Sequence, residues 1–471
     1  MSFNPAELQT WRVLAECNPA FDETPREYHA AGLTLDLTTA GYDDETQKKL
    51  FALAKERNWF AARDFLMEGG IVNPSENRAA LHTALRARSE DVHRSVKDEV
   101  KNELIALRKC MNLVQTLGAI DIIHVGMGGS GLAPMFLRSF FQGFIGQKYR
   151  LHIVVNADPS TLLKIKQQCD PRKTIVVVAS KTFMTDETML VATHLRTWLG
   201  DLNRMFAVTG EPAGAVAFGV PADNVMGYPA WLGGRFSLWG SVVFPVLLAF
   251  GNAPFEELLH GARTMDEHFA TAPIEKNLPV LFALAHIWQR NFMHCSSHAV
   301  LPYADALRHF PVYIQQLEME SNGKASPVAT ASVNYGGVGT TVQHSFMQWL
   351  HQGTEKSYSD FIIVDKLPGE EELAVFLRNS VLAQSSALAH GAPPEFPGGR
   401  PSNLIFMEEL SSFTLGALLA LYEHKVYLEA HIWGINCFDQ PGVELGKRLT
   451  RKIGEGQTPR STAKRLARYK S

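Results

Sequence analysis

The stretch QLEMESNGKA, residues 316–325, places two glutamates beside a turn-forming sequence. If residues 316–320 are extended, Gln316, Glu318 and Glu320 share one face, because strand side chains alternate. The Ser-Asn-Gly at 321–323 would then end the strand as a turn. We therefore predict a strand here, with a carboxylate at its end that could act as an acid or a base. An ordinary solvated glutamate is the alternative interpretation.

Hydroxyl groups and one ammonium group follow the apolar run TIVVVA, residues 174–179. Ser180, Lys181, Thr182 and Thr185 bring three hydroxyls and a positive charge to a point where a helix is expected to begin. These groups, with the free N–H groups of a first helical turn, can hold a phosphate dianion. The alternative is a capped helix without a ligand, because the Asp-Glu after Thr185 is also typical of a helix start.

A second candidate phosphate site is the glycine-rich stretch VGMGGSG, residues 125–131, which contains Gly129 and Ser130. Glycines let backbone N–H groups approach an anion closely, and a following helix adds its dipole. The stretch lacks the GxGxxG spacing of dinucleotide-binding folds, and no GKS or GKT follows it. A tight turn with a purely structural role is therefore the alternative.

Two further stretches carry polar groups suited to catalysis. In LGGRFSLWG, Arg235 follows Gly234 and could stabilise a developing oxyanion. FDQPGVELGK holds Gln440 and Lys447 at the end of a helix, where the lysine could equally be a solvated surface group.

In TVQHSFMQWLHQG, residues 341–353, His344 and His351 stand seven residues apart, which predicts one face of a single helix. Neither histidine has a companion at metal-ligand spacing, so we predict no metal site there. The five cysteines are scattered without the paired spacing of a zinc site or a redox dithiol. Their arrangement suits a reducing cytosol.

Short β-branched runs alternate with helical patterns through most of the chain. They predict strands at 119–125, 151–157, 174–179 and 204–209, and a second set at 312–320, 360–367 and 403–410. Continuous apolar strands separated by helices indicate parallel sheets buried on both faces. We therefore predict an α/β fold of two tandem three-layer sandwiches. Ligands bind such sheets beyond the carboxyl ends of the strands, where the candidate groups stand.

The predicted organisation has four parts. Residues 1–92 form a helical segment packed on the larger domain, 93–255 and 256–450 form the two sandwiches, and 451–471 form a basic arm. A long helix is expected within 411–436, with Ser411 or Ser412 as its N-cap. Residues 447–471 hold nine Lys and Arg against one Glu. This tail suits either an anionic partner or a solvated arm on the protein or a neighbouring subunit.

Net charge and the distribution of apolar residues restrict the class of protein. A net charge of −3 gives no electrostatic reason to expect a nucleic-acid partner. The N-terminus lacks a basic start followed by an apolar core, so no signal peptide is predicted. Residues 236–255 are uncharged and long enough to span a bilayer, but Pro245 and two glycines interrupt them. We predict a buried core helix there, no membrane partner and a cytoplasmic location.

Taken in chain order, these stretches resemble the phosphoglucose isomerase (glucose-6-phosphate isomerase) family. The matching segments are IVNPSENRAALHTALR, GMGGSG, SKTFMTDET, GGRFSLWG, QLEMESNGK, QHSFMQWLHQGT and YEHKVYLEAHIWGINCFDQPGVELGK, within residues 70–450. The resemblance implies two sugar-isomerase (SIS) domains and a homodimer with active sites shared between subunits. It also implies reversible isomerisation of glucose 6-phosphate and fructose 6-phosphate through ring opening and a cis-enediolate, without cofactor or metal.

The resemblance further implies a role for each matching position. Glu320, rather than Glu318, would move the proton between C1 and C2. His344 of the second copy, helped by Lys447, would open the sugar ring, and Arg235 would stabilise the enediolate. The phosphate would be held by Ser180, Lys181, Thr182 and Thr185, and the sugar contacted by Gly129, Ser130, Gly234, Gln316 and Gln440. A histidine suits ring opening because it exchanges protons near neutral pH.

Some positions depart from the usual pattern of the family: Gly131, Ala133, Met184, Thr341, Val342 and Pro441. None removes a proposed catalytic group, but they bear on which sugar phosphates are accepted. One alternative is a related isomerase that also takes mannose 6-phosphate. Another is a non-catalytic SIS-domain sensor of sugar phosphates, which could lose the Glu/His/Lys set that this sequence retains.

Overall fold

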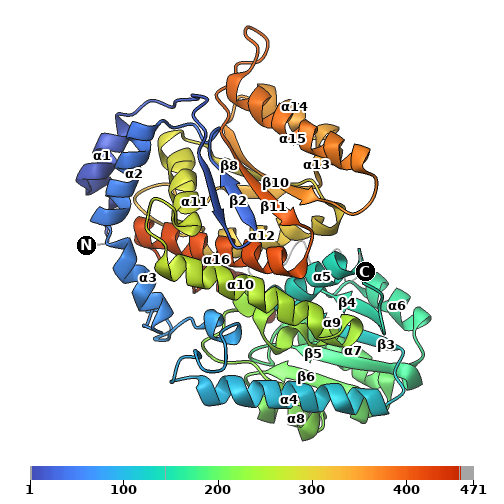
Figure 1. The fold of residues 1–471 in the computed structure, drawn as a ribbon. Coiled ribbons are helices and arrows are strands. Elements are labelled where there is room, and N and C mark those ends of the chain that lie inside the picture. Colours follow the sequence, from blue (N-terminus) through green and yellow to red (C-terminus); the bar gives the residue numbers. More distant parts are fainter. Residues whose placement is uncertain (1–2, 144, 456, 458–471) are drawn as a thin grey trace.

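The computed structural model describes residues 3–143, 145–455 and 457. The first of its two sheets has five strands and lies in the part of the molecule that contains α4 and α8 (Figure 1). Their order is β4-β3-β5-β6-β7, and all neighbouring pairs are parallel. The strands are β3 (Asp121–Gly126), β4 (Arg150–Val154), β5 (Thr174–Ala179), β6 (Met205–Thr209) and β7 (Val225–Gly227). The four strands predicted for this part of the chain are confirmed, and β7 was not predicted.

This first sheet is the middle layer of a sandwich. Alternate residues of β5 enter different apolar clusters: Ile175 and Val177 on one face, Val176 and Val178 on the other. The second face is covered by α6 (Pro159–Gln168), α7 (Asp186–Leu199) and α8 (Pro212–Phe218). The first face is covered by α4 (Lys97–Thr116), α5 (Gly129–Gln142) and α9 (Phe244–Phe250). Burial on both faces explains why the strands are continuous apolar runs.

The second sheet has six strands in the order β1-β2-β11-β10-β8-β9. Its four parallel strands are β8 (Ser297–Pro302), β9 (Val333–Gly336), β10 (Ser357–Lys366) and β11 (Ser402–Glu409). One face packs on α13 (Gly339–Gln343), α14 (Met347–Gln352) and α15 (Glu371–His390). The predicted strands at 360–367 and 403–410 are confirmed, whereas β8 and β9 were not predicted.

The N-terminal segment is not wholly helical, and the prediction is wrong at residues 27–36. Besides α1 (Gln9–Ala15), α2 (Asp44–Glu56) and α3 (Trp59–Met67), it forms the hairpin strands β1 (Glu27–Ala30) and β2 (Leu33–Asp36). Strand β2 pairs antiparallel with β11 and so closes one edge of the second sheet. The predicted domain boundaries at 92, 255 and 450 stay predictions, and residues 458–471 of the basic arm lie outside the described part.

The strand predicted at 312–320 is wrong, because these residues lie in helix α12 (Phe310–Asn322). Pro311 stands in the first turn, where its missing N–H costs no hydrogen bond. The buried positions follow a helical period: Phe310, Tyr313, Ile314, Leu317 and Ser321. The alternation over 316–320 was too short to distinguish a strand from this pattern.

Helices α10 (Ala253–Thr271) and α16 (Ser412–Trp433) cross the middle of the molecule between the two sheets (Figure 1). Ser411 is the N-cap of α16 and forms a reciprocal capping box with Thr414, which confirms one of the two predicted caps. The two helices touch at glycines. A Cβ on Gly416 would lie 1.9 Å from the carbonyl oxygen of Leu258, so this position has no room for a side chain.

Residues 236–250 of the uncharged stretch are buried as predicted, whereas 251–253 are exposed, and the stretch is not one helix. It consists of 3₁₀ segments at Gly234–Trp239 and Ser241–Val243, then α9, and then the start of α10. Pro245 stands in the first turn of α9, and Gly251 ends that helix. Among the described residues, the structure contains no helix with the length and apolar character needed to cross a bilayer.

Candidate active site

A cavity of about 600 Å³ lies beyond the carboxyl ends of β3, β4 and β5. Its wall is completed by α12, by the start of the 3₁₀ segment at 234 and by residues 440–447. It brings together all the predicted site residues except His344: Gly129, Ser130, Ser180, Lys181, Thr182, Thr185, Gly234, Arg235, Gln316, Glu320, Gln440 and Lys447. Six separate chain segments therefore meet at the place where α/β sheets bind ligands.

The glycine-rich turn fits tightly under the cavity. Gly128 has a positive φ of 56°, which a residue with a side chain rarely adopts. A Cβ on Gly129 would lie 1.9 Å from the carbonyl oxygen of Gly234, so α5 begins in direct backbone contact with the segment that carries Arg235. The glycines therefore serve close packing and also leave the first turn of α5 open to the cavity.

The hydroxyl groups of Ser180 and Thr185, which also line the cavity, lie 3.2 Å apart. Thr185 is the N-cap of α7, but its side chain makes no capping hydrogen bond. The N–H groups of the first helical turn are thus available together with these hydroxyls and that of Thr182. Such an arrangement can bind an oxyanion such as a phosphate group.

Lys181, in the hydroxyl-rich loop at residues 180–185, bonds to the backbone of another segment of the cavity wall. Its Nζ donates hydrogen bonds to the carbonyl oxygens of Ala230 (2.7 Å) and Leu232 (2.8 Å), which precede Gly234. Burial lowers the pKa of this ammonium group to about 8. The side chain therefore ties the hydroxyl-rich loop to the segment carrying Arg235, and it adds positive charge to the cavity wall.

Arg235 is almost completely buried and is fixed by several acceptors. Its Nε donates to Ser321 Oγ at 2.6 Å and its Nη1 to Gln440 Oε1 at 3.0 Å, while Nη2 bonds the carbonyl of Cys437. Nη1 also lies 3.8 Å from Glu320 Oε2. The guanidinium group is therefore held rigidly beside a carboxylate, as a stabiliser of developing negative charge requires.

Glu320 lies near the end of α12 and faces the cavity. Gln316, one helical turn earlier, donates a hydrogen bond of 2.8 Å to Glu320 Oε2. About a quarter of the side chain stays exposed, at 24%. This carboxylate is fixed in orientation and still reachable by a ligand, which suits a general base.

Lys447 enters the cavity from α17 (Glu444–Gly454), where its Nζ pairs with Glu444 Oε1 at 2.9 Å. His344, in contrast, is exposed and does not line the cavity. The prediction of one helix carrying both histidines is wrong: His344 follows the end of α13, and His351 lies in α14, bonded to Gln384. A role for His344 in this site would need a second copy of the chain.

A family profile described as "Phosphoglucose isomerase" matches residues 36–466. The chain belongs to the phosphoglucose isomerase family.

Similar proteins in this family come from several bacteria. The chain is 44% identical over 427 residues to a glucose-6-phosphate isomerase of Stenotrophomonas maltophilia, covering 87% of this chain and 84% of that one. It is 40% identical over 493 residues to that of Burkholderia multivorans, covering 95% and 90%. The crystal structure of a glucose-6-phosphate isomerase from Chlamydia trachomatis superposes with a TM-score of 0.89, at 30% identity and 99% coverage of both chains.

Other polar groups line the cavity that were not predicted from the sequence of this phosphoglucose isomerase family member. Tyr228 and Thr188 line it with buried hydroxyls that have no hydrogen-bond partner within the described protein, and the same holds for Gln316 Oε1. Asn156, after β4, also lines it. Buried polar atoms without partners are uncommon, so a polar ligand or water fits these positions. Asn156 lay inside the strand predicted at 151–157, and only the earlier end of β4, at Val154, places it beyond the strand. Tyr228 offered no signal in the sequence.

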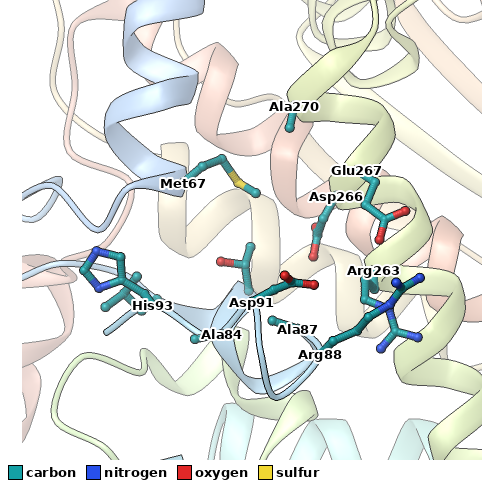
Figure 2. Close-up of a pocket in the computed structure, with 12 residues that line it drawn as sticks. Met67, Ala84, Ala87, Arg88, Asp91, His93, Arg263, Asp266, Glu267 and Ala270 are labelled. Carbon is teal, nitrogen blue, oxygen red and sulfur yellow. The ribbon is translucent and has the colours of Figure 1, made fainter. Parts of the chain in front are cut away.

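A second, smaller cavity of about 220 Å³ lies between the N-terminal segment and α10, and Figure 2 shows the side chains that line it. Met67, Leu81 and Ala84 form apolar walls, and charged side chains such as Arg88 and Arg263 surround them. It contains none of the predicted site residues. In this phosphoglucose isomerase family member, the polar groups suited to a sugar phosphate therefore converge on the larger cavity.

Proposed function

We propose that the protein interconverts glucose 6-phosphate and fructose 6-phosphate in the larger cavity. The observation that carries the proposal is the pairing of Glu320 with the buried Arg235 at 3.8 Å, at a cavity that also contains the hydroxyls of Ser180 and Thr185. Family membership and relatives named glucose-6-phosphate isomerase support this choice of substrates.

The chemistry follows from this arrangement. With the phosphate on the hydroxyl-rich loop and the start of α7, C1 and C2 of the open-chain aldose lie beside Glu320. Its carboxylate removes the proton on C2, the electron pair forms the C1–C2 double bond, and O1 takes the negative charge beside Arg235. Return of a proton to C1, with transfer of the O2 proton to O1, yields the ketose and restores the carboxylate.

The proposal includes a homodimer with shared sites and a cytoplasmic location. The exposed His344, away from the cavity of its own chain, would open the sugar ring in the site of the second copy, helped there by Lys447. The five free cysteines support a reducing compartment.

The test is turnover of fructose 6-phosphate, followed by coupling glucose 6-phosphate to its dehydrogenase. We expect Glu320→Gln to lower kcat by about 100-fold or more, as for a lost general base. Glu372→Gln, at an exposed glutamate of α15, is the matched control and should keep wild-type activity. A folded wild type without turnover, or an active Glu320→Gln, would refute the proposal. Turnover of mannose 6-phosphate, measured in parallel, would show that the enzyme is the related isomerase that also accepts this substrate.

A further inference from the structure

Helix α12 directs two carboxylates to opposite sides. Glu318 and Glu320 are two residues apart, which corresponds to a rotation of about 200° around a helix. Glu320 reaches the cavity, whereas Glu318 points into the protein core with 4% of its surface exposed. A buried charge of this kind requires partners, because desolvation of an unpaired carboxylate is costly.

The partners of Glu318 hold it on three sides. The ammonium group of Lys425, on the central helix α16, donates to Glu318 Oε1 and is itself fully buried. Asn334 Nδ2 donates to Glu318 Oε2 at 2.5 Å, and His298 Nδ1 lies 3.2 Å from the same oxygen. Lys425 also pairs with Glu429 at 3.2 Å. Glu318 is therefore joined to a charged network rather than to a single ion pair.

A second connection to α16 follows one helical turn later. Asn322 Nδ2 donates to the carbonyl oxygen of Val426 at 3.0 Å and to Glu429 Oε2 at 3.1 Å. Residues 318 and 322 thus attach the same face of α12 to α16, before and after Glu320. Ser321, between them, accepts the hydrogen bond from Arg235 Nε. The two attachments consequently fix the base and the arginine through one short piece of helix.

We propose that Lys425, through Glu318, and Asn322 are positioning residues that set the rotation of α12 and so the place of Glu320 beside Arg235. The inference rests on the proposed function. A buried ion pair is weak evidence for stability, since well-packed apolar side chains often stabilise as much. A broken buried pair is strongly unfavourable, however, so the network opposes small rotations of α12. Displacing a catalytic group by about 1 Å can cost roughly 100-fold in rate.

The test compares wild type with Glu318→Gln/Lys425→Met, which removes both charges at nearly constant volume, and with Asn322→Ala. We expect kcat for glucose 6-phosphate to fall by about 100-fold in the first variant, as for a displaced base. KM should stay within about threefold, because the hydroxyl-rich loop at residues 180–185 is untouched. The isotope effect on kcat with substrate deuterated at C2 should increase, because proton removal becomes slower relative to the other steps. Asn322→Ala should show the same changes in smaller degree.

The isotope effect separates positioning from folding, since loss of folded enzyme lowers the apparent kcat but leaves the isotope effect unchanged. Asp121→Asn is the control: it removes a buried carboxylate paired with Arg150 at the opposite end of β3, and it should keep the wild-type isotope effect. An unchanged isotope effect in Glu318→Gln/Lys425→Met and Asn322→Ala would overturn the inference. An inactive wild type would instead refute the proposed function.

Discussion

Lys181 is a residue whose position predicts a pH dependence. Its ammonium group spans from the hydroxyl-rich loop to the carbonyls of Ala230 and Leu232, and burial lowers its pKa to about 8. The charged form therefore predominates below pH 8 and is lost above it, earlier than for an exposed lysine. Loss of the proton removes positive charge from the cavity and weakens both hydrogen bonds.

We expect kcat/KM for fructose 6-phosphate to fall by only about a sixth between pH 7 and 7.5 and by about tenfold between pH 7 and 9, as for a single group of pKa 8 that must be protonated. A pH profile of kcat/KM measures this. Lys181→Met should have a lower kcat/KM at pH 7 and should lack this decline. A decline of the same midpoint in Lys181→Met would assign it to a different group.

The parts of the site that could be predicted from the sequence are short loops in which several polar or glycine residues follow a strand. Ser180 to Thr185 and Gly129-Ser130 stand directly after strands, so their meeting followed from the topology alone. Glu318 and Glu320 could not be separated by local pattern, because an extended and a helical chain place them differently. Only the resemblance to a family singled out Glu320, and only the packing of α12 on α16 explains the burial of Glu318.

The close contact between helices α10 and α16 predicts that a larger residue at position 416 destabilises the protein. Their contact depends on glycine, since a Cβ at position 416 would overlap the carbonyl of Leu258. Gly416→Ala should lower the free energy of unfolding by about 2–3 kcal/mol through overpacking. The midpoint of urea-induced unfolding measures this. Gly146→Ala is the control, because a Cβ there meets nothing within 4 Å. Equal midpoints for the two variants would show that the helices separate without strain.

The elements that the sequence predicted best are those that are apolar on both faces, such as β5 and β6. Strands β1 and β2 are short and half-exposed, and they gain their hydrogen bonds from each other and from β11, far along the chain. No local pattern could reveal such pairing. Helix α12 was missed for the opposite reason, because a local alternation of five residues outweighed the longer helical period.

Mixed dimers of two inactive variants test whether each active site is shared between two subunits. Glu320→Gln and His344→Ala should each be inactive alone, because each destroys every site of its own homodimer. After mixing and subunit exchange, the mixed dimers should contain one intact site, restoring about a quarter of wild-type activity in a twofold-symmetric dimer. Activity is measured as before, and exchange is verified with differently tagged chains. Proven exchange without recovery would count against active sites shared between subunits.

The hairpin of β1 and β2 also has a consequence for synthesis. Residues 27–36 leave the ribosome early, yet β2 pairs with β11 at residues 402–409. At ~5–20 residues per second, this partner appears roughly 20–70 seconds later. The five-stranded sheet, at 121–227, has all its strands well before then. The hairpin is thus among the last parts to reach its final place, and the nascent second sheet keeps an open edge until β11 has been made.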